Sequence, residues 1–374
     1  MKKLGFGLMR LPMLENGTDI DIDQLNKMVD TYLEHGFTYF DTSYVYHDGS
    51  SEIAIRKALV ERHNREDYVL ATKLPAFAIE KEEDVDKIFN EQLYKCGVEY
   101  FDYFLLHNVN SIRYKTNIKE CHMFDHLKQY KEEGKIKHIA ISYHDDALSL
   151  EKILKEHPEI EAVQIALNYF DMDACLIQAK ACYDIICKYQ RKVIVMEPVK
   201  GGMLASAPSE AVQLMKDYSS ASLASWAIRF AASLDNVLVV LSGMSNLKQV
   251  NDNISYMEDF KPLNNDELEI LGKVIPIYEK HSKMGIIDYK KYESINQKGI
   301  NARVILETYN HCMLQPNPGF AAEGNYFSIE KAKHNLKREE PCFDGKVVVD
   351  GNDITDDLNT AQQFLQNHAF YWYM

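Results

Sequence analysis

The chain has 374 residues, of which 46% are hydrophobic and 26% charged, and its formal net charge at pH 7 is −14. It is longer than one average domain, although barrel folds of about 250 residues are common as single units. The acidic balance argues against nucleic acid and anionic membrane surfaces as partners, because both require basic patches. An anionic small molecule stays compatible with it, since backbone N–H groups can bind phosphate in an acidic protein.

The seven cysteines are scattered along the chain and form no Cys-x-x-Cys pair. Disulfide frameworks and zinc sites show tighter spacing, so we expect buried thiols in a reducing compartment. The N-terminus MKKLGFGLMRLP has no long apolar core, and no stretch approaches about 18 uncharged apolar residues. We therefore expect a cytoplasmic protein without a signal peptide or membrane span. The oligomeric state stays unknown at this level.

Short apolar runs alternate with amphipathic ones from residue 4 to about residue 256. Most of the apolar runs are continuous instead of alternating in polarity, which favours strands buried on both faces, as in a parallel sheet. We expect eight strands, at 4–9, 38–42, 68–73, 100–107, 136–142, 162–168, 192–198 and 237–243.

Helix-like stretches lie between the expected strands. Residues 21–36, 82–97 and 123–135 are such stretches, and each stops at or beside a glycine. Eight strands alternating with helices predict an α/β fold, the closed (β/α)8 TIM barrel. An open doubly wound sheet is the alternative. It normally carries G-x-G-x-x-G after the first strand, and GFG at 5–7 lacks the third glycine.

The alternation stops near residue 282, and the remaining sequence has a different pattern. It contains the Pro/Gly-rich stretch MLQPNPGFAAEGN, a predicted turn at VDGND and the aromatic end HAFYWYM. We expect 1–282 to form the barrel and 283–374 to form a C-terminal extension or small appended domain of unknown role. The aromatic residues 370–373 would be unfavourable in water, which suggests that they anchor this end.

Ionisable and polar residues stand at the ends of the expected strands. In a parallel barrel these ends converge on one face, where catalytic side chains gather. In chain order they are Asp41 with Tyr46, Lys73, His107, Ser142 with His144, Gln164 with Asn168, Glu197, and Gly243 with Ser245. Each alone has a bland explanation, such as a helix cap or a core histidine. Taken together, they favour a functional site, because a hydrophobic core is not expected to have an ionisable group at the end of each of three apolar strands.

Seven motifs occur in a recognisable order: GFTYFDTSYVYHDGSSE, ATKLP, YFDYFLLH, AISYHD, VQIALNYFD, MEPVKGG and SGMSNLKQVNDN. Together they resemble the successive signatures of the aldo-keto reductase superfamily, over roughly residues 1 to 275. The resemblance implies a TIM barrel that reduces a small-molecule aldehyde or ketone by hydride transfer from NADPH or NADH. It implies no metal, because the cofactor carries the hydride chemistry.

The resemblance also implies four catalytic residues. Tyr46 would be the general acid that protonates the carbonyl oxygen of the substrate. Lys73 would lower the pKa of the Tyr46 phenol from its ordinary value of about 10, and Asp41 would hold Lys73 charged and oriented. His107 would hydrogen-bond the substrate oxygen and help to set its angle of approach.

The nicotinamide dinucleotide would lie across the later strands. By the resemblance, Ser142 and Gln164 would hydrogen-bond the nicotinamide carboxamide. The loop after the last strand opens a helix, where phosphate is favoured. Its expected cofactor contacts are Gly243, Met244, Ser245, Gln249, Asp252 and Asn253. Relatives that require NADPH commonly carry Lys or Arg at the positions held here by Gly243 and Gln249, and only Lys248 is nearby. The preference for NADPH over NADH is therefore slight.

Three strand-end residues have open roles. Asn168 either belongs to the site or is a loop side chain that caps its own backbone. His144 would line the substrate side of the nicotinamide ring. Glu197 and Pro198 end the seventh expected strand, where many relatives place an aromatic residue that stacks on the nicotinamide.

The C-terminal part departs from the subgroup that the motifs resemble. That subgroup often carries a ferredoxin-like segment whose Cys-x-x-Cys-x-x-Cys ligands hold iron–sulfur clusters. Residues 283–374 contain only Cys312 and Cys342, too few thiolates for a cluster, so we expect none. We expect this part to cover the barrel mouth or to make an oligomer contact. Two other functions stay open: an epimerase or lyase acting on a sugar-like substrate, and a non-catalytic regulatory or scaffold member of the superfamily.

Overall fold

The computed structural model describes residues 1–285 and 287–369. They pack into two compact units. The barrel unit comprises residues 1–167, 182–198 and 224–263, and the extension unit comprises 168–181, 199–223 and the chain from 264 onward. The extension unit thus takes in two segments from within the barrel sequence. The proposed boundary after residue 282 falls inside it and stays a proposal, and the aromatic residues 370–373 lie outside the described residues.

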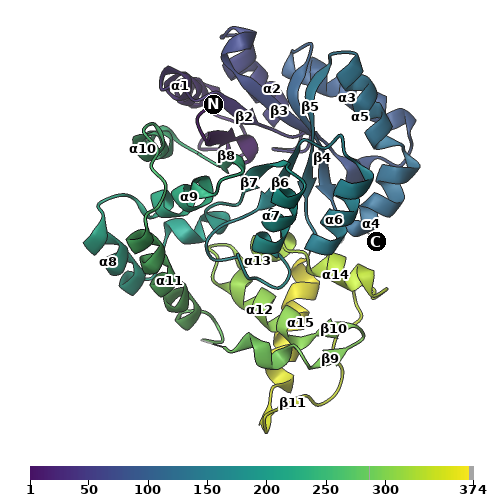
Figure 1. The fold of residues 1–374 in the computed structure, drawn as a ribbon, viewed down its shortest axis with the longest axis vertical. Helices are drawn as coiled ribbons and strands as arrows, with labels where there is room; N and C mark the ends of the chain where they lie inside the picture. The colour runs from purple at the N-terminus through teal and green to yellow at the C-terminus, as the bar shows by residue number, and fades with distance from the viewer. Residues whose placement is uncertain (286, 370–374) are drawn as a thin grey trace. The chain divides into compact units, whose positions relative to one another are not determined.

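Eight parallel strands close into a barrel in the order β1 to β8 (Figure 1), which confirms the predicted (β/α)8 fold. The strands are β1 Leu4–Gly7, β2 Tyr39–Asp41, β3 Val69–Leu74, β4 Phe101–Val109, β5 Ile136–Tyr143, β6 Ala162–Ala166, β7 Lys192–Met196 and β8 Val237–Ser242. The barrel closes where β1 pairs with β8, with Gly5 opposite Leu241. A Cβ on Gly5 would lie 2.7 Å from side-chain carbons of Leu241 and Val239, so the strand can pass there only with glycine.

Side chains from the strands fill the barrel interior. The buried cluster there takes residues from every strand except β1 and comprises Tyr39, Ala71, Leu105, Ala140, Ala162, Ile194, Val239 and Leu241. These positions are the inward half of the continuous apolar runs, and the helices cover the outward half. The interior is therefore a packed core, which confines chemistry to the strand ends.

Helices follow the strands as the sequence predicts. They are α1 Ile22–Glu34, α2 Ser51–Ile55, α3 Glu83–Cys96, α4 Ser111–Arg113, α5 Met123–Glu132, α6 Ala147–Glu156, α7 Ala179–Lys188, α9 Leu223–Ser233 and α10 Leu247–Met257. The Asp21 side chain caps α1 by accepting from the Gln24 N–H. Gly97 ends α3 in the left-handed conformation, with φ of 69°, and its N–H donates to the Leu93 carbonyl. Helices α1, α3 and α5 confirm the three predicted helices, and Gly36, Gly97 and Gly134 lie at or just after their C-terminal ends.

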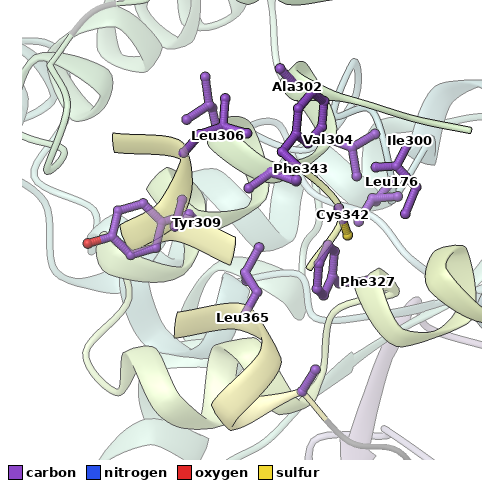
Figure 2. Packing of buried hydrophobic residues seen from close by; sticks show 14 of the residues in the cluster. Leu176, Ile300, Ala302, Val304, Leu306, Tyr309, Phe327, Cys342, Phe343 and Leu365 are labelled. Atoms are coloured by element: carbon purple, nitrogen blue, oxygen red, sulfur yellow. The ribbon is translucent and has the colours of Figure 1, made fainter. Parts of the chain in front are cut away.

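The extension unit is mainly helical. Its helices are α8 Ser209–Tyr218, α11 Asn265–Lys280, α12 Ala302–Met313, α13 Pro318–Glu323, α14 Phe327–Lys333 and α15 Thr355–His368, and its short hairpins pair β9 Asn296–Gln297 with β10 Ile300–Asn301 and β11 Val348–Val349 with β12 Asn352–Asp353. Asp350 and Gly351, both with positive φ, make the turn predicted at VDGND. The unit has its own apolar core, in which Figure 2 shows Leu306, Phe343 and Leu365.

All seven cysteines are free thiols, and five of them are buried, whereas Cys175 and Cys187 are partly exposed. Across the described ranges, no three or more His, Cys, Asp or Glu side chains gather as a metal site would require. None of the helices in those ranges combines the length and the apolar character needed to cross a bilayer.

Candidate active site

A buried ion pair lies at the C-terminal ends of β2 and β3. Lys73 is 0% exposed and Asp41 is 2% exposed. The Lys73 ammonium donates to Asp41 Oδ1 at 2.5 Å and to the Thr42 carbonyl oxygen at 2.8 Å. The other carboxylate oxygen, Asp41 Oδ2, is buried and meets no donor from the described residues. The two strands thus bring together a charged pair that the sequence placed only at separate strand ends.

Tyr46 lies in the loop after β2 and faces both Lys73 and His107. The Lys73 Nζ is 4.8 Å from the centroid of the Tyr46 ring. The Tyr46 and His107 rings meet edge to face, with centroids 5.9 Å apart, and His107 Nδ1 is 3.0 Å from the Ser43 hydroxyl oxygen. The four side chains predicted to be catalytic therefore form one group in the structure.

Burial and the Lys73 charge act in opposite directions on Tyr46. Burial disfavours a phenolate and raises the pKa of Tyr46, and the Lys73 ammonium lowers it. Burial outweighs the ammonium, so the Tyr46 pKa lies above its ordinary value, although the effect of Lys73 itself has the predicted direction. For Lys73, burial opposes the charged form, but Asp41 and Tyr46 raise its pKa above the usual range. Lys73 is therefore held charged as expected, beside a protonated phenol.

The two histidines of the site are uncharged at neutral pH. Burial, and then the charge of Lys73, holds the pKa of His107 well below its usual range. Burial and the Arg113 guanidinium lower the pKa of His144 to about 3. A neutral imidazole carries one N–H and can still donate a hydrogen bond. The state of His107 thus fits the role of donor to a substrate oxygen.

Ser142 on β5 and Gln164 on β6 are neighbours in the sheet. They are 1% and 2% exposed. The Ser142 hydroxyl oxygen lies 2.9 Å from His144 Nε2, whereas Gln164 Oε1 is buried and has no hydrogen-bond partner within the described ranges. An unmet buried acceptor costs on the order of 1–3 kcal/mol. A carboxamide N–H would satisfy it, so these residues fit the nicotinamide predicted for them.

The loop after β8 leads into the N-terminus of α10, as the sequence predicts. Asn246 caps the helix by accepting from the Gln249 N–H at 3.0 Å, and the Gln249 side chain accepts from the Ser245 N–H at 2.7 Å. Gly243 is exposed, whereas Met244 is 1% exposed and packs inside. Gly243 and Ser245 therefore lie where the helix dipole favours an anion.

Asn253 is buried on α10, and Asp252 beside it is partly exposed. The Asn253 Nδ2 donates to the Ser242 hydroxyl at 2.6 Å, and Asn253 Oδ1 accepts from the Tyr256 hydroxyl at 2.5 Å. The observed contacts of this amide tie α10 to the end of β8. Contacts of Asn253 and Asp252 with an adenine stay predictions.

Comparison with known proteins decides the family. The model of the aldo/keto reductase family matches residues 3–276. The chain belongs to the aldo/keto reductase family. Its members are oxidoreductases, and the match covers all of the site described above. The chain is also 31% identical over 183 residues to the probable aldo-keto reductase 1 of Glycine max, an alignment that covers 46% of this chain and 50% of that relative. The chain thus spans half the length of that curated relative.

Solved aldo-keto reductases share the fold of this family member. The holo form from Bacillus halodurans superposes with a TM-score of 0.59 at 24% identity, over 75% of this chain and 94% of the other. The Klebsiella pneumoniae protein, solved in complex with NADPH, gives a TM-score of 0.60 at 18% identity, over 73% and 91%. At these identities the likeness concerns the fold.

Three residues of this aldo/keto reductase that contact the site were missed in the sequence. Thr42 and Ser43 contact Lys73 and His107, and their place directly after Asp41 was the available signal. Arg10 follows β1, and its Cδ would lie 3.3 Å from a Cβ on Gly243. The predicted barrel could have indicated Arg10, because closure of the barrel places the end of the first strand beside the end of the eighth.

Asn168 and Glu197 lie beyond the strands that were expected to carry them, because β6 ends at Ala166 and β7 at Met196. Asn168 Oδ1 accepts from the backbone N–H groups of Phe170 and Asp171, each at 3.0 Å. This is the backbone-capping alternative that the sequence left open. Glu197 has φ of 53°, a left-handed conformation that cannot continue a strand.

Proposed function

We propose that the chain is an NAD(P)H-dependent oxidoreductase that reduces an aldehyde or ketone, with Tyr46 as the general acid. The observation that carries this proposal is the Lys73 ammonium, bonded to Asp41 at 2.5 Å and 4.8 Å from the Tyr46 ring centroid. Family membership supports oxidoreductase chemistry, and the Klebsiella pneumoniae neighbour in complex with NADPH supports a nicotinamide cofactor.

In this proposal, the four side chains around Lys73 share the work on the carbonyl oxygen. A bound nicotinamide cofactor supplies the hydride to the carbonyl carbon. The Tyr46 hydroxyl and the His107 N–H hydrogen-bond the carbonyl oxygen, and Tyr46 passes its proton to that oxygen as negative charge develops there. Lys73 stabilises the phenolate that remains, and Asp41 keeps Lys73 charged. One hydride and one proton are added, the product is an alcohol, and solvent returns a proton to Tyr46.

The cofactor would be held by the later strands of the barrel. Ser142 and Gln164 would bind the carboxamide, because Gln164 Oε1 is a buried acceptor that meets no donor in the described ranges. The proposed contacts after β8 are Gly243, Met244, Ser245, Gln249, Asp252 and Asn253. Arg10 and Lys248 bring positive charge to this loop, which supports a slight preference for NADPH over NADH.

A carbonyl panel run with both cofactors tests the function. Oxidation of NADPH or NADH in proportion to added aldehyde or ketone is the expected result. Turnover of a sugar-like substrate without net cofactor oxidation would instead indicate an epimerase or lyase. Tight nucleotide binding without turnover of any substrate would indicate a scaffold, and either result would contradict the proposal.

A further inference from the structure

A second buried lysine–aspartate pair lies within the extension unit. Lys200 is 7% exposed and Asp171 is 3% exposed. The Lys200 ammonium donates to both oxygens of the Asp171 carboxylate, at 2.6 and 2.8 Å, and Asn168 Nδ2 donates to Asp171 Oδ2 at 2.8 Å. Removing one partner of such a pair leaves a buried charge uncompensated. The pair is therefore a strong constraint on the segments that carry it.

The pair joins the two segments that follow β6 and β7. Asn168 and Asp171 lie in the segment that begins just after Ala166, the last residue of β6, and Lys200 lies just after Met196, the last residue of β7. Lys200 has φ of 47°, in the left-handed region that a residue with a side chain seldom adopts. Such a conformation persists when the surroundings hold it, and the ion pair is one such restraint.

One face of α12 holds the segment after β6. Arg303, Glu307 and His311 are spaced four residues apart, so they share a face of this helix. The Arg303 guanidinium donates to the Asp173 carbonyl at 3.1 Å, and Glu307 Oε1 accepts from the Cys175 N–H at 2.7 Å. These contacts fix the backbone of the segment at two points.

His311, at the end of the same face, meets the ion pair itself. Its Nδ1 is 4.0 Å from Asp171 Oδ1, and its ring centroid is 4.8 Å from that of Phe170. Leu176 completes the attachment, since it is 9% exposed and belongs to the core of the extension unit. Figure 2 shows it beside Ile300. The segment after β6 is thus built into the C-terminal part of the chain by hydrogen bonds, charge and apolar packing.

We propose that α12 is a positioning element, which fixes the segments after β6 and β7 through Arg303, Glu307 and His311 and through the Asp171–Lys200 pair. In a TIM barrel, binding residues gather at the C-terminal strand ends, where these two segments begin. Gln164 stands on β6 just before the first segment. Asp171, Lys200 and His311 act through the two segments and do not touch the substrate. The kinetic test of this proposal rests on the proposed function, because it measures carbonyl reduction.

Hydrogen exchange and kinetics of matched variants test this role. Lys200→Met removes the ion pair with Asp171, and Lys200→Arg keeps a cation that can bind both oxygens of the Asp171 carboxylate. Lys331→Met is the control. Lys331 is a buried lysine of the same unit whose ammonium donates to the Arg338 and Glu340 carbonyls, at 2.8 and 2.6 Å. In Lys200→Met we expect exchange in peptides 168–181 and 199–206 to speed up by at least about fivefold. We also expect KM for the carbonyl to rise about tenfold while kcat falls less.

Rescue and control decide the outcome. Lys200→Arg should restore most of the KM and the protection of both peptides, and Lys331→Met should leave both within about twofold of wild type. Unchanged exchange in the two peptides, or equal effects of Lys200→Met and Lys331→Met, would overturn the proposal. If Lys200→Met does not fold, His311→Gln decides in its place, with faster exchange of peptide 168–181 expected and unchanged exchange contradicting it. A wild-type protein without carbonyl reduction would refute the proposed function and leave the exchange comparison intact.

Discussion

The barrel unit and the extension unit each bury a lysine–aspartate pair, and the two pairs differ in how completely they are satisfied. Asp171 accepts hydrogen bonds at both oxygens, whereas Asp41 Oδ2 has no donor within the described ranges. Burial raises the pKa of Asp41 above its ordinary value despite Lys73. For Asp171 burial acts the same way, but Lys200, His311 and Asn168 outweigh it and the pKa is lowered. A buried carboxylate oxygen without a hydrogen-bond donor, close to a protonated phenol, is typical of a functional site. A carboxylate with hydrogen bonds at both oxygens is typical of a structural ion pair.

Lys73→Met breaks the barrel pair and has the largest expected effect of the pair variants. The Tyr46 phenolate formed on proton transfer loses its neighbouring ammonium, so carbonyl reduction should fall by about 10³-fold. Single-turnover oxidation of bound NAD(P)H measures this step. Lys200→Met is the matched control, because it removes the other buried ammonium and should leave the rate of hydride transfer within about tenfold of wild type. Equal losses in the two variants would erase the distinction between the pairs.

Asp41→Asn tests whether the Asp41 carboxylate keeps Lys73 charged. Without its charge, burial of Lys73 is opposed only by weaker contacts, so the pKa of Lys73 should fall below its raised wild-type position. We expect the rate of carbonyl reduction to drop about 10²-fold and to decline with rising pH earlier than in wild type. The pH profile of kcat measures the shift, and an unmoved alkaline limb would contradict it.

His311→Asn tests the extension pair through stability. Burial and the Lys200 charge lower the pKa of His311 to about 4 in the folded protein, below the ordinary value of 6.5. The unfolded chain therefore binds a proton first as pH falls, and folding stability should decrease between about pH 6.5 and pH 4. The loss attributable to this group is at most about 3 kcal/mol. Urea unfolding across that range should show a flatter profile in His311→Asn, and a profile as steep as wild type would contradict this.

Arg10→Met has the smallest expected effect. Arg10 is exposed beside Gly243, and exposed charges contribute modestly and are screened by salt. We expect nucleotide affinity to weaken by about threefold to tenfold, more for NADPH than for NADH, with the difference shrinking at high salt. Fluorescence titration measures it, with Lys248→Met as the comparison. An affinity ratio unchanged at low salt would remove Arg10 from the cofactor site.

Local signals in the sequence predicted the barrel, whereas contacts between residues far apart in the sequence could not be predicted. Continuous apolar runs and glycine stops are readable one segment at a time, and strand convergence then brings Asp41, Tyr46, Lys73 and His107 to one face. The raised pKa of Tyr46 depends on how deeply the loop is buried, which no motif states. Strand β7 ends earlier than predicted because Glu197 has a left-handed backbone conformation, which the residue type does not indicate.

The contacts within the extension unit could not be predicted from the sequence for a different reason. His311 and Asp171 are far apart in sequence, and neither belongs to a motif that pairs them. The alternation that ended near residue 282 suggested a boundary along the chain, whereas packing groups the C-terminal part with segments 168–181 and 199–223. Periodicity describes single elements and carries no information on such contacts.

Rapid-mixing kinetics of Tyr46→Phe test the central claim most directly. The substitution retains the ring that faces Lys73 and His107 and removes the one proton that the account assigns to the carbonyl oxygen. We predict a loss of carbonyl reduction of at least about 10³-fold, with NADPH affinity within about twofold of wild type. Carbonyl reduction at a rate near that of wild type would contradict the account.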